Sequence, residues 1–439
     1  MNKNLIALSV ILMLVVVSTI FLYGCTKQVT PTPNNNQNQT NQETPPVNNN
    51  NNQTTANNTP VSPVILNNVV DANNLFALDL YSRYKSNEGN MFFSPFSISS
   101  ALAMTYEGAK GKTAEEMQSV LHLPNDTQKI RSDYSSIYAE INQVDKPYQL
   151  TTANALWAQK DYPFVSDYFT TVEEYYDGKA TNLDFIKDTE NSRQTINNWV
   201  ADNTNNKIKD IIPKGVLDVS TRLVLTNAIY FKANWSRQFD AQNTRDGQFK
   251  LSSGKTVNAQ MMHQESYYNY GETSDLQILE MDYLGNDLSM LIILPKENNL
   301  NQIENIFSTE KLNELRSNMT TEEVIVTLPK FKFETKYFMA DTLKAMGMPT
   351  AFKYPDADFT GMSPTGQLYI DEVIHQTFVE VAEYGTEAAA ATVVEMRAGS
   401  AMPPKEPKIF TADHPFIFII QQKGTGNILF MGRVSDPTK

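Results

Sequence analysis

The sequence predicts an α+β fold with mainly antiparallel β-sheets. In the first part of the folded region the apolar residues follow helical spacing, whereas the second part shows strand-like alternation. Near the end of the chain, two apolar runs at 415–421 and 427–434 flank Lys423-Gly424-Thr425-Gly426, which is typical of the turn of a β-hairpin. Helices that precede strands along the chain favour α+β over alternating α/β architecture.

The early helices show both periodicity and start signals. Phe76, Leu80 and Tyr84 are four residues apart and would lie on one helix face. Ser94-Pro95 predicts a helix start, with serine as the N-cap and proline at the first helical position. The segment Thr113-Ala114-Glu115-Glu116 has the pattern of a capping box, so we expect the next helix to begin there and to stop before Pro124. Residues 196–200 carry apolar side chains at helical spacing and predict another helix.

Strand patterns follow. Leu223, Leu225, Ile229 and Phe231 alternate around Asn227, and residues 288–294 form a continuous apolar run that is typical of a buried strand. Val324, Val326 and Leu328 alternate before Pro329. These segments predict the strands of the later part of the chain.

Composition narrows the classes of function. The chain has 439 residues, of which 41% are hydrophobic and 10% aromatic, enough for a sizeable core. Its formal charge is −13, so nucleic acid is a poor candidate partner. Cys25 is the sole cysteine, which excludes an internal disulfide and any cysteine-based metal site or thiol catalyst in the folded region.

The N-terminus predicts export and an anchor. After Lys3, residues 5–22 are almost wholly apolar and lead to Cys25. Residues 1–25 resemble a bacterial lipoprotein signal peptide, in which the cysteine becomes lipidated after cleavage. An uncleaved membrane anchor is the alternative, since 18 apolar residues nearly span a bilayer. Both interpretations place the folded region outside the cytoplasm.

Residues 26–63 predict a disordered tether. The segment is rich in Asn, Gln, Thr and Pro and contains almost no apolar side chain. Such a composition cannot bury enough surface to offset the entropy of ordering. We therefore expect one folded domain over residues 64–439, held away from the membrane by this tether.

An unusual segment lies near the C-terminus. Residues 383–392 read Glu-Tyr-Gly-Thr-Glu-Ala-Ala-Ala-Ala-Thr and follow a strand-like run at 377–381. Taken with period two, one face is small or apolar throughout and comprises Thr386, Ala388, Ala390, Thr392 and Val394. Gly399, Pro403, Pro404 and Pro407 then prevent regular structure. The segment predicts a loop that is able to become a half-buried strand.

The sequence gives no support for an enzyme. It contains four histidines, His122, His263, His375 and His414, and no close-spaced zinc motif. A G-x-S-x-G motif is absent, and the nearest segment, at 361–364, does not fit it. We therefore expect no catalytic residue, no metal and no cofactor.

Four segments in order resemble the serpin family. They are residues 90–117, residues 223–235, the hinge at 383–392, and the ending at 413–418 with 430–434. The resemblance covers about residues 66–437. It implies three mainly antiparallel β-sheets, eight or nine helices and an exposed reactive loop. It also implies a mechanism in which a protease cuts the loop, forms an acyl-enzyme and is trapped when the cleaved loop inserts into the central sheet.

The resemblance assigns roles to individual residues. The hinge comprises Glu383, Gly385, Thr386, Glu387, Ala388, Ala389, Ala390, Ala391 and Thr392. Ser94, Ser97, Asn227 and His375 match a polar cluster beneath the sheet, where strands must part, although a buried histidine on a strand is also an ordinary core residue. Trp235 and Lys330 match the region where the loop first enters, and we predict an ion pair between Lys330 and Glu383.

The reactive bond stays open between three positions. The usual family count of fourteen residues beyond Gly385 indicates Gly399–Ser400, which we favour. Arg397–Ala398 would suit a trypsin-like protease, and Ala401–Met402 would suit an elastase-like or subtilisin-like protease. A bond two residues earlier or later changes the length of the inserting arm accordingly.

The resulting expectation is a suicide-substrate inhibitor of extracellular serine endopeptidases. The alternative is a non-inhibitory serpin that acts as a cell-surface binding or structural protein. The small side chains at 386–391 favour inhibition, because a bulky or charged hinge would enter the sheet slowly. We expect a monomer whose partners are the target protease and, through lipidated Cys25, the cell membrane of a bacterium. Secretion is the alternative location.

Overall fold

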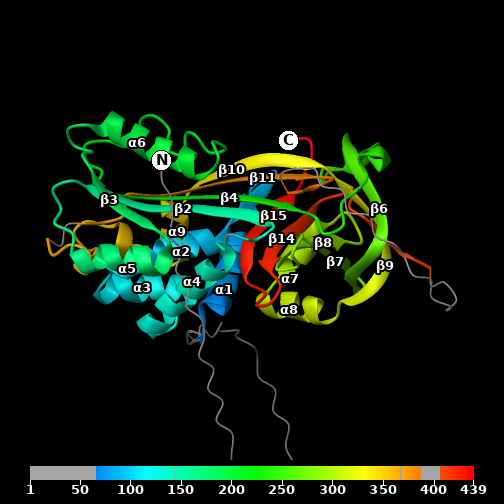
Figure 1. The fold of residues 1–439 in the computed structure, drawn as a ribbon, viewed down its shortest axis with the longest axis horizontal. Coiled ribbons are helices and arrows are strands. Elements are labelled where there is room, and N and C mark those ends of the chain that lie inside the picture. Colours follow the sequence, from blue (N-terminus) through cyan, green and yellow to red (C-terminus); the bar gives the residue numbers. More distant parts are fainter. Residues whose placement is uncertain (1–65, 144, 366–367, 387–405) are drawn as a thin grey trace, which may run out of the picture. The chain divides into compact units, whose positions relative to one another are not determined.

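A computed structural model describes residues 66–143, 145–365, 368–386 and 406–439. They belong to one compact unit, Val61–Lys439. Within these residues there are nine α-helices and fifteen β-strands, and the class is α+β as predicted (Figure 1). The helices are α1 Val69–Tyr84, α2 Pro95–Tyr106, α3 Gly111–Leu121, α4 Thr127–Ile141, α5 Ser166–Tyr176, α6 Thr189–Asn203, α7 Leu300–Ile306, α8 Thr309–Ser317 and α9 Ala340–Met346.

The central sheet has six strands in the order β10-β11-β12-β4-β2-β3. Their bounds are β2 Tyr148–Gln159, β3 Lys179–Leu183, β4 Leu223–Asn234, β10 Phe331–Phe338, β11 Glu372–Ala382 and β12 Gly385–Thr386. The pairs β11–β4 and β2–β3 are parallel, and the others are antiparallel. In Figure 1, α6 lies over one face of this sheet, and α2, α4 and α5 lie on the opposite side.

The second sheet has nine strands. The order is β1-β15-β14-β8-β7-β6-β9-β13, and β5 pairs with β6 outside this path. Their bounds are β1 Met91–Phe93, β5 Arg245–Lys250, β6 Thr256–Glu272, β7 Leu276–Asp282, β8 Leu288–Pro295, β9 Thr320–Pro329, β13 Lys408–Thr411, β14 Phe416–Gln422 and β15 Ile428–Val434. Strands β14 and β15 form the antiparallel hairpin that the sequence predicts.

The strands of the described residues form two hydrogen-bonded sheets, not the three that the resemblance implies. The reason is the length of β6, which has 17 residues. One part of β6 pairs with β5, its far end pairs with β7, and much of its length pairs with β9. Hydrogen bonding is therefore continuous through β6, and two expected sheets become one.

Helix α2 begins as predicted, whereas α3 does not. Ser94 caps α2, because its hydroxyl accepts a hydrogen bond from the backbone N–H of Ser97, and Pro95 is the first helical residue. The expected capping box at Thr113 is wrong, because α3 already begins at Gly111. The Thr113 hydroxyl instead accepts a bond from the backbone N–H of Asp358, and the Glu116 carboxylate binds Thr350. Tertiary partners thus use the side chains that a local cap would need.

Two apolar clusters hold the sheets. The larger one fills the space between the nine-stranded sheet, one face of the central sheet and helices α1 to α5. The smaller one lies between α6 and the other face of the central sheet. It joins Ile196 and Val200 of α6 to Val224 and Ala228 of β4 and to Ile374 of β11. Helix α6 therefore covers the line along which β4 meets β11.

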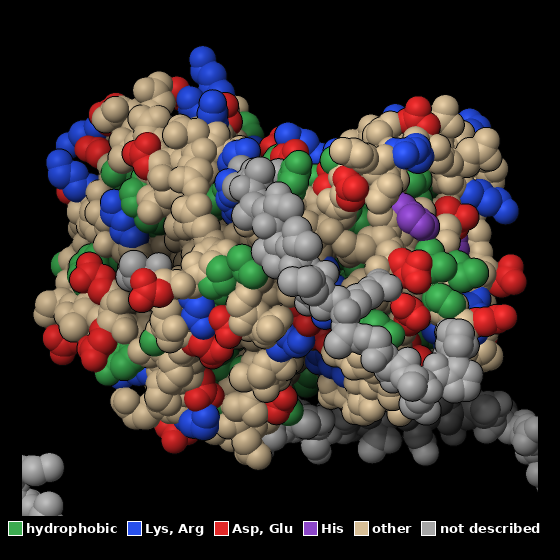
Figure 2. Space-filling view, turned by 45° about the vertical axis from the view of Figure 1, so that its right-hand side comes forward, with side chains coloured by type: hydrophobic (Ala, Val, Ile, Leu, Met, Phe, Trp, Pro, Cys, Tyr) green, Lys and Arg blue, Asp and Glu red, His purple; other side chains and the backbone are tan. Residues whose placement is uncertain are grey.

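The surface mixes both signs of charge. On the face shown in Figure 2, basic and acidic side chains are interspersed. Within the described ranges no helix is long and apolar enough to cross a membrane, and the apolar stretch at 5–22 lies outside those ranges.

Candidate functional site in the central sheet

The site is the line of contact between β4 and β11, which we call the seam. In one part, which we call the lower seam, the two strands pair directly and in parallel, from Glu372 opposite Val224 to Thr377 opposite Ile229. Beyond that point they diverge, and β12 lies between them. We call this other end, at Val381 and Ala233, the upper end. Thr386 of β12 is opposite Val381 on one side and Ala233 on the other, and both pairings are antiparallel. Gly385 and Thr386 of the hinge are thus already part of the sheet.

Gly385 makes this arrangement possible. Its φ angle is +151°, in a region that favours glycine. A Cβ atom at this position would come within 2.0 Å of the carbonyl oxygen of Ala233 on β4. Any larger residue would push β12 away from β4, so this glycine allows the chain to enter the sheet.

Thr386 is held by a buried tyrosine that sequence reasoning missed. The threonine side chain is buried, and its hydroxyl lies 2.7 Å from the Tyr283 hydroxyl. Tyr283 stacks on Trp235, with ring centroids 4.6 Å apart and planes at 12°. Burial raises the pKa of Tyr283, so the phenol stays neutral and can donate or accept this hydrogen bond. No local signal marks Tyr283, because it is 103 residues away from Thr386.

Trp235 fastens the turn between β11 and β12. Its indole N–H donates to the carbonyl of Ala382 at 3.0 Å, and its backbone N–H donates to the carbonyl of Tyr384 at 2.8 Å. The tryptophan is fully buried. Trp235 therefore lies beside the hinge, at the end of the seam where β12 is, and its role in loop entry stays a prediction.

The predicted ion pair between Lys330 and Glu383 is present. The Lys330 ammonium lies 2.9 Å from the Glu383 carboxylate, whose side chain is only 7% exposed. Thr244 donates a further hydrogen bond at 2.8 Å. Burial alone would raise the pKa of Glu383, but the Lys330 and Thr244 donors outweigh it and the pKa is lowered. The carboxylate therefore stays charged and joins the start of the hinge to the residue between β9 and β10.

The four predicted polar residues beneath the sheet are all buried and form one network. The backbone N–H of Ser94 donates to His375 Nε2 at 3.0 Å, so the other ring nitrogen carries the proton and donates to the Asn227 side-chain oxygen. Asn227 in turn donates to the Ser97 hydroxyl. Burial lowers the pKa of His375 to about 3, which keeps the ring neutral.

Asn154 is the member of this network that the sequence did not reveal. It lies on β2 directly opposite Asn227, accepts from Ser97 at 2.9 Å and donates to the Tyr138 hydroxyl at 3.1 Å. Asn154 is the one polar residue in the buried run at 153–158. Because a buried amide needs hydrogen-bond partners, this pattern could have predicted that Asn154 belongs to a polar network. The network links β11, β4 and β2 to helices α2 and α4.

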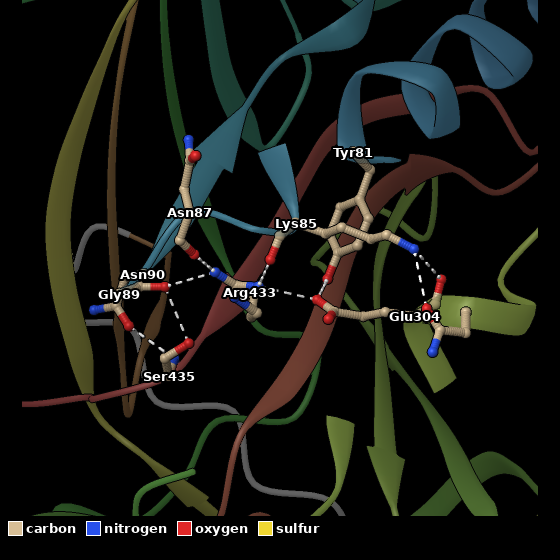
Figure 3. Close-up of polar contacts among 9 residues, drawn as sticks. Tyr81, Lys85, Asn87, Gly89, Asn90, Glu304, Arg433 and Ser435 are labelled. Atoms are coloured by element: carbon tan, nitrogen blue, oxygen red, sulfur yellow. Dashed lines mark hydrogen bonds and ion pairs between the residues drawn. The ribbon is translucent and has the colours of Figure 1, made fainter. Parts of the chain in front are cut away.

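A second network of polar contacts holds β15, the strand to which Ser94 of this cluster is hydrogen-bonded (Figure 3). Arg433 of β15 lies 3.0 Å from the Glu304 carboxylate, and the Tyr81 hydroxyl of α1 donates to the same carboxylate at 2.7 Å. The guanidinium also donates to the backbone carbonyls of Lys85, Asn87 and Gly89. Strand β15 is the one whose Leu429 carbonyl accepts from the Ser94 hydroxyl. A fixed β15 thus positions the polar cluster.

The remaining predicted residues lie outside the described ranges. They are Cys25, the hinge residues 387–392 and the six residues of the candidate reactive bonds at 397–402. Within the described residues, no group of three or more metal-binding side chains is present.

Comparison with known proteins identifies the family. The profile described as Serpin (serine protease inhibitor) matches residues 71–437. The chain belongs to the serpin family. Its relatives include an uncharacterized serpin-like protein of Thermococcus kodakarensis, 44% identical over 97% of this chain and 98% of the relative. The leukocyte elastase inhibitor of Xenopus laevis is 41% identical over 85% of this chain and 100% of its own length.

Solved serpin structures share the fold. Serpin48 of the insect Tenebrio molitor, described as highly specific, aligns with a TM-score of 0.75 at 33% identity, covering 84% of this chain and 98% of its own. Human thyroxine-binding globulin in complex with thyroxine aligns with a TM-score of 0.77 at 30% identity, covering 84% and 99%. The relatives thus include a protein named as an elastase inhibitor and one named as a thyroxine-binding protein.

Proposed function

We propose that this serpin is a single-use inhibitor of extracellular serine endopeptidases. The observation that supports the proposal most directly is the position of β12, which is paired with β11 on one side and β4 on the other. The residues that follow β12 could continue this strand between β4 and β11. The protease serine attacks the reactive bond, the peptide C–N bond breaks, an ester forms, and the new amino terminus leaves with the proton. The freed arm then inserts and carries the esterified protease along before water can hydrolyse the ester.

The register of β12 defines the path of the arm. Continued residue by residue, the antiparallel register would place residue 396 opposite Asp371, which immediately precedes β11, and opposite Leu223 of β4. The side chain of Thr386 meets Tyr283, so residues 388, 390, 392 and 394 would face the same apolar core. In the sequence, Ala388 and Ala390 are small and uncharged. At the start of the arm, next to β12, the side that would enter the core therefore has no charged or bulky side chain.

Insertion would release free energy because the direct pairing of β4 with β11 would be replaced by two pairings, one on each side of the inserted strand. Each inserted residue adds roughly 0.5–1.5 kcal/mol of net hydrogen bonding. For residues 387–396 the total is on the order of 10 kcal/mol, comparable with the stability of a whole domain. The uncut protein would persist because its conversion is slow. The acyl-enzyme can be trapped only if this difference is present.

The test is complex formation with proteases of three specificities. The purified protein is mixed with subtilisin, elastase or trypsin and analysed by denaturing gel electrophoresis. A complex that survives SDS, with loss of protease activity, supports inhibition. Mass spectrometry of the released C-terminal fragment distinguishes Gly399–Ser400, Arg397–Ala398 and Ala401–Met402. Clean repeated cleavage without a complex for all three would favour the alternative, a non-inhibitory cell-surface binding or structural protein.

We also propose that the inhibitor acts as a monomer outside the cytoplasm, anchored by lipid at Cys25. The tether of residues 26–63, as a flexible coil, would have a root-mean-square length of about 35 Å. This length lets the folded domain reach proteases near the cell surface. Replacement of Cys25 by serine should release the protein or leave its precursor uncleaved, whereas release that is unchanged from the parent would refute the anchor.

A further inference from the structure

A second fastening lies at the end of the seam far from β12. Asp371 immediately precedes β11, Leu223 is the first residue of β4, and Arg222 immediately precedes it. The Asp371 carboxylate accepts hydrogen bonds from the backbone N–H of Arg222 at 2.5 Å and from that of Leu223 at 3.0 Å. The backbone N–H of Asp371 donates back to the Leu223 carbonyl at 2.9 Å. One residue thus makes three hydrogen bonds across the seam.

We propose that Asp371 is a clasp that holds the lower seam closed in the uncut protein and must open before the arm is fully inserted. This inference rests on the proposed function. It differs in place from the contacts at the upper end, which hold the hinge and of which one, from Trp235 to Ala382, also reaches the end of β11. Asp371 would therefore control the completion of insertion, whereas Tyr283, Trp235 and Lys330 act at its start.

Strand spacing shows why the clasp cannot survive insertion. Strands that are neighbours in a sheet lie about 4.8 Å apart, so an inserted strand would separate β4 from β11 by about 9.6 Å. A hydrogen bond from N–H to oxygen spans about 2.9 Å. The short aspartate side chain cannot cover the additional distance, so both bonds to the β4 amides would be lost. The clasp thus stabilises the uncut form and contributes nothing to the inserted form.

The neighbouring residue supplies a matched control. The Glu372 carboxylate also accepts two backbone N–H bonds, from Ala340 and from Val373, each at 2.9 Å. Neither partner is on β4, so these bonds do not cross the seam. Both carboxylates are partly buried acceptors of amide hydrogen bonds, and they differ in whether insertion breaks the bonds. Comparison of the two separates the clasp from ordinary structural support.

The test measures melting temperatures of the uncut and cut forms of the full folded chain. The loop is cut with a zinc metalloprotease, which forms no acyl-enzyme, so the arm inserts without cargo. We expect Asp371→Ala to lower the melting temperature of the uncut form by about 2–5 °C and to change that of the cut form by less than about 1 °C. Asp371→Asn keeps one weaker acceptor and should show a smaller fall in the uncut form alone. Glu372→Ala should lower both forms equally.

The outcomes separate the two proposals. Equal falls in both forms for Asp371→Ala, or an unchanged uncut form, would overturn the clasp and leave the inhibitor proposal intact. If Asp371→Ala does not fold, the asparagine variant decides by the same comparison. If the parent protein melts no higher after cutting, there is no insertion, and the clasp and the proposed function are both refuted.

Discussion

Replacement of Thr386 by arginine tests whether the hinge must enter the sheet. Thr386 is 2% exposed and packs against Tyr283. An arginine there would place an unpaired charge among apolar rings, since the nearest partner of this side chain is a neutral phenol. A buried charge without a partner costs about 3–5 kcal/mol, and each 1.36 kcal/mol on the barrier slows a reaction about tenfold. Because Thr386 already lies in the sheet, we expect arginine to displace β12 from the uncut form, so that its re-entry carries this cost and insertion slows by about a hundredfold or more.

The assay is a titration of subtilisin, or of whichever protease forms the complex, with each variant. Slow insertion gives water time to hydrolyse the acyl-enzyme, so Thr386→Arg should be cleaved as a substrate, with many molecules consumed for each protease inhibited. Thr386→Val is the matched control, because it keeps the size and burial and loses only the hydroxyl. If Thr386→Arg inhibits with the same stoichiometry as the parent, the hinge does not enter the sheet and the reasoning is wrong.

Three further predictions concern the seam. Cutting the loop of the parent protein should raise its melting temperature by at least about 10 °C in a calorimetric scan, because about ten residues gain strand pairing; an unchanged value would remove the energy source of the trap. The pKa of His375 is about 3 in the folded protein and about 6.5 in the unfolded chain. The unfolded chain therefore binds the proton more readily, and this contribution to the free energy of unfolding is full above pH 6.5 and falls between pH 6.5 and 3. Urea unfolding across that range should show a weaker pH dependence for His375→Gln, and identical slopes would contradict the assignment. Lys330→Ala should lower the free energy of unfolding by about 1 kcal/mol, because the Glu383 carboxylate would lose its cationic partner at a site with little access to water. Lys332→Ala removes the partner of Glu380 in a more exposed pair and should cost less than about 0.5 kcal/mol. Equal losses in chemical denaturation would show that the hinge pair has no special role.

Much of the local structure could be predicted because its causes lie within a few residues. Ser94 caps α2 through the N–H of Ser97, three positions away, and the C-terminal hairpin depends on its own turn. The alternation at 223–231 shows a strand whatever its neighbours are. The capping box at Thr113 failed for the opposite reason, since Asp358 and Thr350 are more than 200 residues away and take the side chains that a cap would use.

The small side chains on one face of the strand-like segment and the opposite charges of Lys330 and Glu383 are visible in the sequence, and the polar cluster around His375 is expected from the resemblance to the serpin family. The folded molecule alone shows that β12 pairs with both β4 and β11, that Thr386 is hydrogen-bonded to Tyr283, and that Asp371 bonds to Arg222 and Leu223 at the far end of the seam. The bond between Thr386 and Tyr283 joins residues 103 positions apart, and the bond between Asp371 and Arg222 joins residues 149 positions apart. Periodicity reports the faces of one element, whereas the register between distant strands follows from how the whole core packs.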